Sequence, residues 1–233
     1  MLIVEPSFEI LDLPYRAFML TKIETAGRTC YKSTSKLCPA CCGSGYGGVF
    51  EPCPECDGDG SLTAIGFLDK ITSSGHLSVI EHVSATVRII CDRGITHELV
   101  RHRLASFSQE STRYCNYAQG RFGGEITVIR PYFWREDGAR YEVWKRAMEF
   151  AENSYMALIE AGASAQEARS VLPNSLKTEI VITANMREWR HIFELRTAPA
   201  AHQQMREIML PLLAEFKRRA PVIFDDVGKE AAE

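Results

Sequence analysis

The sequence lacks long hydrophobic runs. No apolar stretch approaches the roughly 18 residues that a membrane-spanning helix needs. The first ten residues, MLIVEPSFEI, also lack the basic start of a secretory signal peptide. We therefore expect a cytoplasmic protein, and 233 residues are enough for one large domain with one core, residues 1–233.

The sequence also lacks an excess of basic residues over acidic ones. The chain carries 27 Lys and Arg against 30 Asp and Glu, a formal charge of −3. Proteins that bind nucleic acid through its backbone favour a strongly basic surface, so this balance argues against that class. The hydrophobic content of 45% and charged content of 24% are those of an ordinary globular domain.

Cysteine, by contrast, is plentiful, and five of the eight cysteines fall between residues 35 and 61. This segment is an insertion of different composition, and it repeats the pattern CxxCxGxG in Cys38–Gly45 and Cys53–Gly60. Without an export signal, metal ligation or free thiols are better interpretations than disulfides. Two CxxC pairs separated by eleven residues are typical of a structural zinc site. The expected ligands are Cys38, Cys41, Cys53 and Cys56.

Other interpretations of these cysteines stay open. Cys42 is left over as a non-ligand. The alternative without metal is a set of reduced thiols in a flexible loop. A catalytic zinc is disfavoured because four cysteine ligands leave no open position. The repeat resembles the zinc motif of DnaJ-type chaperones across these two short modules only.

Hydrophobic periodicity predicts alternating helices and strands along the rest of the chain. We expect a first helix that ends at Gly27 and a helix that Thr96 caps. Ser164 and Glu167 form a capping box, and Pro211 is expected to bend the last helix. The predicted strands are 2–5, 83–91, 126–130 and 176–183. The predicted helices are 15–27, 63–74, one from Thr96 through Glu98 into the Arg101 cluster, 137–161, a short one from Ser164 that ends before Pro173, 185–195 and 200–219.

The stretch Arg101–Tyr117, RHRLASFSQESTRYCNY, concentrates guanidinium, hydroxyl and amide groups. Guanidinium groups bind phosphate oxygens bidentately, and hydroxyls complete such a cradle. A solvated basic face is the alternative. Only Glu110 interrupts the run, and the apolar Leu104 and Phe107 indicate partial burial, so a site for a phosphorylated ligand is favoured.

The same stretch resembles the RHRxxSxxxxSxR signature of flavin-dependent thymidylate synthases. Six fixed positions in thirteen residues make the pattern specific. Four other segments resemble that family in the same order and cover nearly the whole chain outside the cysteine insertion. They are Gly27–Tyr31, His76–His82, Ala168–Pro173 and Asn185–Arg196.

The resemblance implies an α+β fold: a single domain with a central, mostly antiparallel sheet flanked by long helices, plus a small zinc-ribbon-like insertion. It also implies that the protein converts dUMP to dTMP. FAD is the implied cofactor, NADPH and methylenetetrahydrofolate are the co-substrates, and a homotetramer with shared active sites is the implied assembly. No nucleic-acid or membrane partner is expected.

The resemblance carries site residues over position by position. Arg196 is the expected catalytic residue, because it would hold the ionised uracil. Residues expected at dUMP are Glu98, Arg101, Gln109, Glu110, Ser111, Thr112, Arg113, Arg169 and Arg196. Residues expected at FAD are Ser78, Arg101, His102, Arg103, Gln109, Asn185, Arg187, His191 and His202. His76 and Tyr114 are expected on the folate side.

The sequence departs from the family at two positions. Glu98 stands where many members carry Gln, and Gln109 where many carry Glu. A carboxylate facing phosphate is repulsive unless it is protonated or paired with an arginine.

Ser111, Cys115 and Cys30 are also candidate nucleophiles. No adjacent His–carboxylate pair is evident to activate Ser111, so a phosphate-cradling hydroxyl is favoured. A buried or incidental thiol is favoured for the two cysteines. Two other functions stay open: a zinc-knuckle module that reads RNA or DNA, and a family member that binds FAD and nucleotide without methyl transfer.

Overall fold

The computed structural model describes residues 1–48 and 51–228, so Val49 and Phe50 of the expected insertion and residues 229–233 lie outside the described residues. The chain forms two compact units that interleave in sequence. Unit 1 contains Met1–Glu9, Val87–Ile182 and His202–Ile208. Unit 2 contains Ile10–Thr86, Thr183–Ala201 and Met209–Glu233. Within the described part of the chain, no helix is both long and apolar enough to cross a membrane.

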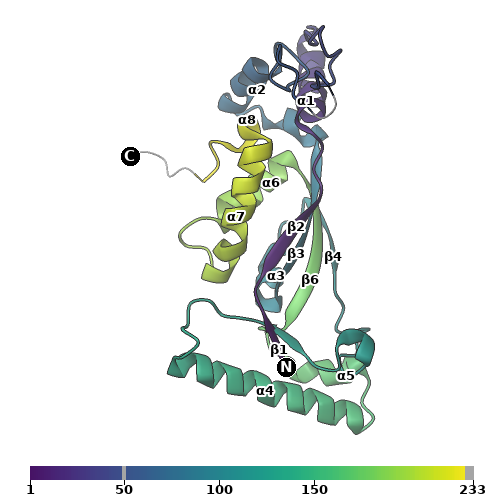
Figure 1. The fold of residues 1–233 in the computed structure, drawn as a ribbon, viewed down its shortest axis with the longest axis vertical. Coiled ribbons are helices and arrows are strands. Elements are labelled where there is room, and N and C mark those ends of the chain that lie inside the picture. The colour runs from purple at the N-terminus through teal and green to yellow at the C-terminus, as the bar shows by residue number, and fades with distance from the viewer. Residues whose placement is uncertain (49–50, 229–233) are drawn as a thin grey trace. The chain divides into compact units, whose positions relative to one another are not determined.

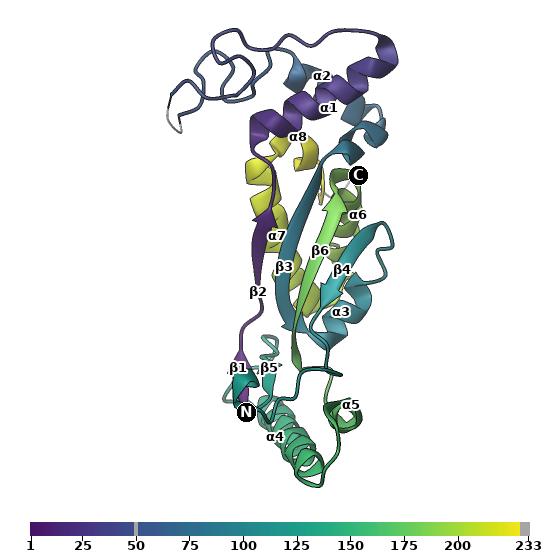
Figure 2. The ribbon, with the colours of Figure 1, turned by 90° about the vertical axis from the view of Figure 1, so that its right-hand side faces the viewer.

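A four-stranded antiparallel sheet has the order β2-β3-β6-β4 (Figure 2). The strands are β2 (Ser7–Asp12), β3 (Ser84–Asp92), β6 (Lys177–Asn185) and β4 (Ala105–Gln109). Burial alternates residue by residue along β3 and β6, as expected for a sheet with one covered face. Each of these two strands contributes residues to both units.

Unit 1 also contains a parallel pair, β1 (Leu2–Val4) with β5 (Thr127–Ile129), in which Ile3 pairs with Val128. The long helix α4 (Ala139–Glu160) runs beside this pair (Figure 1). The other helical segments of unit 1 are α3 (Arg93–Leu99), η2 (Gly120–Phe122), α5 (Ala165–Ala168) and η3 (Arg169–Val171).

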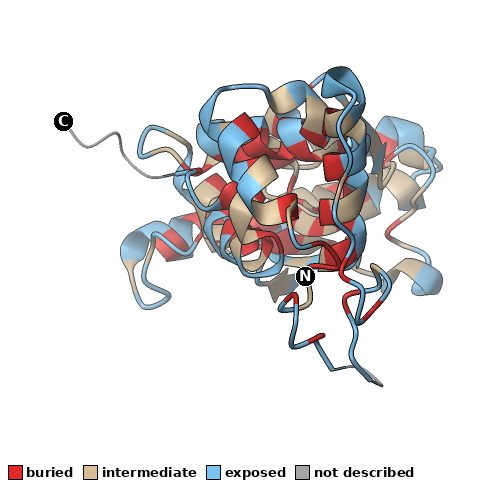
Figure 3. Ribbon diagram, turned by 90° about the horizontal axis from the view of Figure 1, so that it is seen from above, coloured by how far each residue is buried: buried red, intermediate tan, exposed pale blue. Residues whose placement is uncertain are grey.

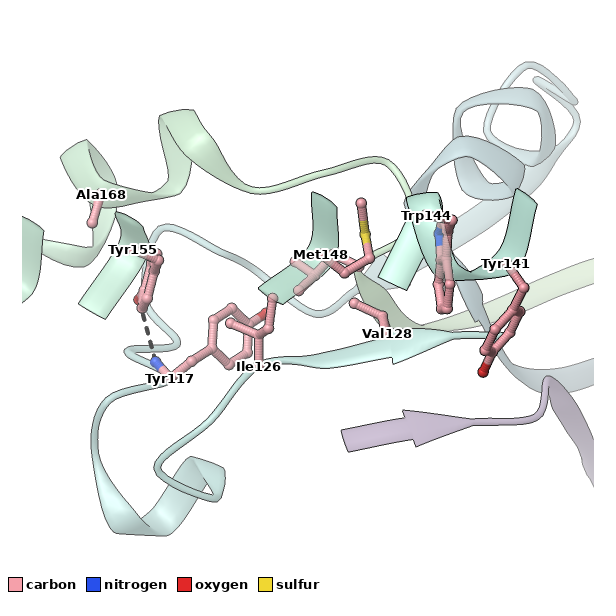
Figure 4. Close-up of a cluster of buried hydrophobic side chains, with 9 residues drawn as sticks. Tyr117, Ile126, Val128, Tyr141, Trp144, Met148, Tyr155 and Ala168 are labelled. Carbon is pink, nitrogen blue, oxygen red and sulfur yellow. Dashed lines mark hydrogen bonds between the residues drawn. The ribbon is translucent and has the colours of Figure 1, made fainter. Parts of the chain in front are cut away.

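The core of unit 1 lies under α4 (Figure 4). Tyr141, Trp144, Met148 and Tyr155 recur at helical spacing and are buried, so this face of α4 belongs to the core. The indole N–H of Trp144 donates to Ser175 Oγ at 3.1 Å, so the buried polar edge of this ring is satisfied.

Unit 2 is mainly helical, and its core is aromatic. Trp189 and Phe193 of α6 (Met186–Arg196) pack with Phe216 and Phe224, with ring centroids 5.1–5.9 Å apart. Buried and exposed positions alternate along the helices (Figure 3). The other helices are α1 (Arg16–Tyr31), α2 (Ala64–Ser73), η1 (Leu77–His82), α8 (Pro221–Phe224) and α7 (Gln203–Arg219), which begins in unit 1.

The α+β fold with an antiparallel sheet and flanking helices is confirmed, whereas the single-domain extent of 1–233 stays a prediction. The capping box is also confirmed, because Ser164 N–H donates to Glu167 at 2.8 Å. The predicted ends of two helices are wrong. Helix α1 runs past Gly27 to Tyr31 and ends where Lys32 adopts φ 46°. Helix α3 begins at Arg93, because Asp92 Oδ1 accepts the Ile95 N–H at 2.8 Å and so takes the capping role predicted for Thr96.

Candidate functional site

The signature stretch forms a turn, a strand and a second turn in unit 1. Arg101 N–H and His102 N–H donate to the carbonyls of Glu98 and Leu99, so Arg101–Arg103 lie in the tight turn between α3 and β4. His102 is buried, whereas Arg101 and Arg103 are exposed. The sequence did not predict strand β4, because its residues are mostly polar and form no run of apolar side chains.

Four expected phosphate-binding arginines of unit 1 are exposed: Arg101, Arg103, Arg113 and Arg169. Among residues 1–48 and 51–228 their guanidinium groups make no ion pair, and that of Arg113 lies 5.3 Å from the centroid of the Tyr114 ring. Exposed, unpaired guanidinium groups are suited to an anionic ligand. This donor set fits the phosphates of FAD and dUMP.

Glu110 lies at the exit of β4 and is held from two sides. Its Oε1 accepts the Tyr117 hydroxyl at 2.7 Å, and its Oε2 accepts Lys177 Nζ at 2.9 Å. The backbone carbonyl of Glu110 accepts a 3.3 Å hydrogen bond from the guanidinium of Arg93. Both carboxylate oxygens of Glu110 are therefore engaged by residues of unit 1.

Tyr117 connects this carboxylate to the core under α4. Its backbone N–H donates to the Tyr155 hydroxyl at 3.2 Å, as the dashed line in Figure 4 shows. Burial, together with the hydrogen bond to Glu110, raises the pKa of Tyr117 far above its ordinary value. The tyrosine therefore stays a neutral donor to Glu110.

Gln109 is oriented toward its neighbouring elements. Its amide nitrogen donates to Thr96 Oγ1 at 2.9 Å and to Thr178 Oγ1 at 3.2 Å. Thr112 is buried, and Ser111 Oγ accepts the Arg113 N–H at 3.3 Å. The Gln109 amide thus ties the end of β4 to its neighbours, and the Ser111 hydroxyl orders the turn that presents Arg113.

A cavity of about 220 Å³ lies in unit 1 beside the start of α3. Two expected site residues line it: Glu98, expected at dUMP, and His202, expected at FAD. Burial raises the pKa of Asp92, and the nearby His202 offsets part of that effect. The other lining residues are Gly94, Ile95, Asn174, Ser175 and Gln204.

The remaining expected residues lie in unit 2. His76 precedes η1, Ser78 lies within it, and both side chains are exposed. Asn185 caps α6, because its Oδ1 accepts the Glu188 N–H at 2.8 Å. Arg187 pairs with Glu81 at 2.6 Å.

His191 and Arg196 lie further along α6, of which Arg196 is the last residue. Burial raises the pKa of Glu188, and His191 offsets part of that shift. The helix thus carries four of the expected residues, counting the cap.

The four expected zinc ligands converge. The Sγ atoms of Cys38, Cys41, Cys53 and Cys56 all lie within 4.8 Å of one another, and all four residues are buried. The pairs 38–53 and 41–56 are 3.8 and 3.7 Å apart. Zinc–sulfur bonds of about 2.3 Å in a tetrahedron place the sulfurs about 3.8 Å apart, so the spacing fits zinc. We call this cluster the four-cysteine site.

Backbone donors complete the four-cysteine site. Gly45 N–H donates to Cys41 Sγ and Gly60 N–H to Cys56 Sγ, each at 3.3 Å. Gly45 and Gly60, the last glycines of the two CxxCxGxG repeats, have positive φ of 79° and 73°, a conformation that favours glycine. The leftover Cys42 is exposed and lies outside the cluster.

Sequence reasoning did not find the residues that support the site. Lys177, Thr178 and Arg93 contact the signature strand and the turn after it, yet each lies in an ordinary strand or helix without a motif. Their roles arise from contacts between segments far apart in the chain, and a single sequence does not display such contacts.

Comparison with known proteins settles the family. Residues 18–222 match the family described as Thymidylate synthase complementing protein. A flavin-dependent thymidylate synthase of Corynebacterium efficiens is 33% identical over 224 residues, with 89% of this chain and 79% of the relative covered. The chain belongs to the flavin-dependent thymidylate synthase family.

Other family members match over a shorter span. The synthase of Geobacter sulfurreducens is 40% identical over 163 residues, which cover 70% of this chain and 68% of the relative. That of Pyrococcus furiosus is 37% identical over 153 residues, covering 65% of this chain and 62% of the relative.

A solved structure shares the fold. The UMP/dUMP methylase PolB of Streptomyces cacaoi, bound with 5-Br UMP, aligns with a TM-score of 0.68. The alignment covers 97% of this chain and 95% of PolB, at 19% identity. At this identity the likeness establishes the fold alone.

Proposed function

We propose that the chain catalyses the reductive methylation of dUMP to dTMP with FAD, NADPH and methylenetetrahydrofolate. Family membership supports the reaction class. The observation that carries the proposal is a set of exposed, unpaired guanidinium groups in unit 1: Arg101, Arg103 and Arg113 of the signature turns and Arg169 of η3. A dinucleotide and a nucleotide monophosphate would bring three phosphate groups to such a set.

In the proposed reaction, a methyl group replaces the hydrogen on uracil C5. Methylenetetrahydrofolate gives the carbon, the C5 hydrogen leaves as a proton, and tetrahydrofolate is released. When bound, FAD supplies the hydride that completes the methyl group, and NADPH restores the reduced cofactor. Arg196 would stabilise negative charge that develops in the pyrimidine ring.

The other residues would bind and orient. Arg101, His102, Arg103, Gln109 and His202 of unit 1 are proposed flavin contacts. Glu98, Ser111, Thr112, Arg113 and Arg169 are proposed for dUMP, together with Arg101 and Gln109. From unit 2, Ser78, Asn185, Arg187 and His191 are proposed for FAD. His76 of unit 2 and Tyr114 of unit 1 are proposed for the folate side.

For Glu110 we propose a supporting role at the nucleotide, because both of its carboxylate oxygens are engaged by Tyr117 and Lys177. Its hydrogen bonds would keep the Ser111–Arg113 turn in a conformation that receives the phosphate.

Zinc at the four cysteines is proposed to be structural, because a closed set of four thiolate ligands leaves no position for substrate. A cytoplasmic homotetramer with shared active sites completes the proposal.

Tritium release tests the reaction. With dUMP tritiated at C5, the protein should release label to water only when FAD, NADPH and methylenetetrahydrofolate are all present. The same mixture should contain dTMP. If FAD and dUMP bind but no label is released, the chain is a binding relative without methyl transfer, and the proposal fails.

A further inference from the structure

The cysteine-rich insertion is joined to the rest of unit 2 through one buried carboxylate. Glu24 of α1 is fully buried. Its Oε2 accepts the Ser61 hydroxyl at 2.7 Å, and its Oε1 accepts the Thr63 hydroxyl at 2.6 Å and Arg28 Nε at 2.8 Å. Ser61 and Thr63 lie at the exit of the insertion, whereas Glu24 and Arg28 lie on α1.

The entry and exit of the insertion are also bonded to each other. Leu37 pairs with Ser61 in an antiparallel bridge, Leu62 N–H donates to Lys36 O at 2.8 Å, and Cys38 N–H donates to Gly60 O at 3.0 Å. The zinc ligand Cys38 therefore lies directly beside the residues that bind Glu24. We call the segments 36–38 and 60–63 the neck.

The four-cysteine site itself rests on the first turn of α1. A Cβ atom on Gly45 would lie 2.6 Å from Ala17 Cβ, and one on Gly60 would lie 2.9 Å from the same atom. Arg16 pairs with Asp59 at 2.7 Å. The two glycines that donate to the cysteine sulfurs are thus also points of close approach to α1.

Helix α1 in turn packs against the segment that carries expected cofactor residues. It contacts both α2 and η1, and η1 contacts α6. At Gly27 the approach is close, because a Cβ atom there would lie 2.6 Å from the Phe67 ring and 3.5 Å from Val79 Cγ1. Val79 is the neighbour of Ser78, the expected flavin contact.

We propose that the zinc-bound insertion positions the His76–Ser78 segment for cofactor binding, acting through Glu24 and α1. Glu24, Ser61 and Thr63 are positioning residues, because none of them needs to touch cofactor. The inference rests on the proposed function for what the segment binds. It adds that the metal site and the cofactor site of this chain are energetically coupled.

The coupling follows from the chemistry of a buried carboxylate. Without zinc, Cys38 is no longer bound to a metal and no longer anchors the neck. The Ser61 and Thr63 hydroxyls that donate to Glu24 are then no longer held in place. Of the three donors to Glu24, only Arg28 lies on α1 itself, so the carboxylate is left short of hydrogen bonds when the two hydroxyls move. Water must then replace them, and α1 has to shift or open to admit it. This movement of α1 shifts the surface on which η1 packs.

The test uses the full chain with a variant that breaks the link but keeps the zinc ligands, Ser61→Ala/Thr63→Val. The matched control is Ser44→Ala/Thr25→Val, which removes one hydroxyl from the insertion and one from the exposed face of α1. A swap, Ser61→Thr/Thr63→Ser, keeps both hydroxyls. Each protein is assayed for zinc content, thermal unfolding, FAD affinity by flavin fluorescence, and dUMP affinity at saturating FAD.

We expect the link variant to retain zinc and to bind FAD about tenfold more weakly, with dUMP affinity unchanged. The control and the swap should match wild type. Chelating zinc from wild type should weaken FAD binding by the same factor, and chelating it from the link variant should weaken it no further.

Two outcomes overturn the proposal. One is a folded link variant that binds FAD as tightly as wild type. The other is a loss of FAD affinity on zinc removal that is as large in the link variant as in wild type. If wild type itself takes up no FAD, the proposed function fails instead, so the two failures are distinguishable.

Discussion

The Tyr117 hydroxyl donates a 2.7 Å hydrogen bond to Glu110 Oε1 and thereby connects the signature turn to the core under α4. Lys177 holds the other oxygen at 2.9 Å. Tyr117, at the end of the signature stretch, and Lys177, which belongs to no motif, thus fix the carboxylate beside the proposed nucleotide cradle. The turn Ser111–Arg113 begins at this anchored residue.

Glu110→Gln should loosen that turn. The substitution removes the charge that Lys177 pairs with, and the pair is only 18–24% exposed. We expect a loss of about 1–3 kcal/mol in the free energy of unfolding and a raised KM for dUMP with little change in FAD affinity. Glu149→Gln, on the exposed side of α4, is the control and should match wild type. An unchanged KM in the Glu110→Gln variant would contradict the anchoring role.

Tyr117→Phe should alter the alkaline stability profile. The folded state holds the pKa of Tyr117 above its ordinary value of about 10, so above that pH the unfolded chain releases a proton that the folded chain keeps. Stability therefore falls as pH rises through this window. In the Tyr117→Phe variant, the free energy of unfolding should fall less steeply with pH, by about 1.4 kcal/mol per pH unit. Denaturant unfolding between pH 9 and about 11.5 measures this free energy for both proteins. Equal slopes for wild type and Tyr117→Phe would refute the raised pKa of Tyr117.

Gly27→Ala should destabilise unit 2. An added Cβ would lie 2.6 and 2.7 Å from two atoms of the Phe67 ring, so the ring would have to move, at about 1–3 kcal/mol. Phe67→Leu in the same chain should recover part of that loss. Gly66→Ala on α2 is the control, because nothing lies within 4 Å of its added Cβ, and it should be neutral or stabilising. Thermal unfolding of the four variants tests the contact, and full additivity of Gly27→Ala and Phe67→Leu would argue against it.

Cys38→Ser should abolish zinc binding, whereas Cys42→Ser should leave about one zinc per chain. Cys38 Sγ lies within the four-cysteine site, and Cys42 is exposed outside it. Because metal binding contributes free energy to folding, the Cys38→Ser variant should also unfold at lower temperature. Atomic emission on protein purified without chelator gives the stoichiometry. Wild-type protein without zinc would rule out the metal site.

Cys115→Ala should keep most activity, and Arg196→Ala should lose nearly all of it. Burial raises the pKa of the Cys115 thiol, and the Glu110 carboxylate raises it further, so the reactive thiolate is disfavoured. Arg196 is the proposed charge-stabilising group at the pyrimidine. Rates of dTMP formation by both variants decide between a thiol and an arginine mechanism. An inactive Cys115→Ala variant that still binds FAD would favour the thiol.

The sequence predicted the fold class, the four-cysteine site and the long helix α4, because each depends on a local repeat or a specific motif. Helix α1 passing Gly27 was missed because a glycine usually marks a helix end, whereas here it makes room for Phe67. Strand β4 was missed because its residues alternate between half-buried and exposed without a run of apolar side chains. The roles of Lys177 and Glu24 arise from long-range contacts, and spacing along a single chain does not encode such contacts.

The visible spectrum of the purified protein tests the central claim most directly. We expect a yellow protein whose flavin absorbance is bleached by NADPH without oxygen, and returns when dUMP and methylenetetrahydrofolate are added, with one dTMP formed per flavin reoxidised. A colourless protein that takes up no added FAD would contradict the account.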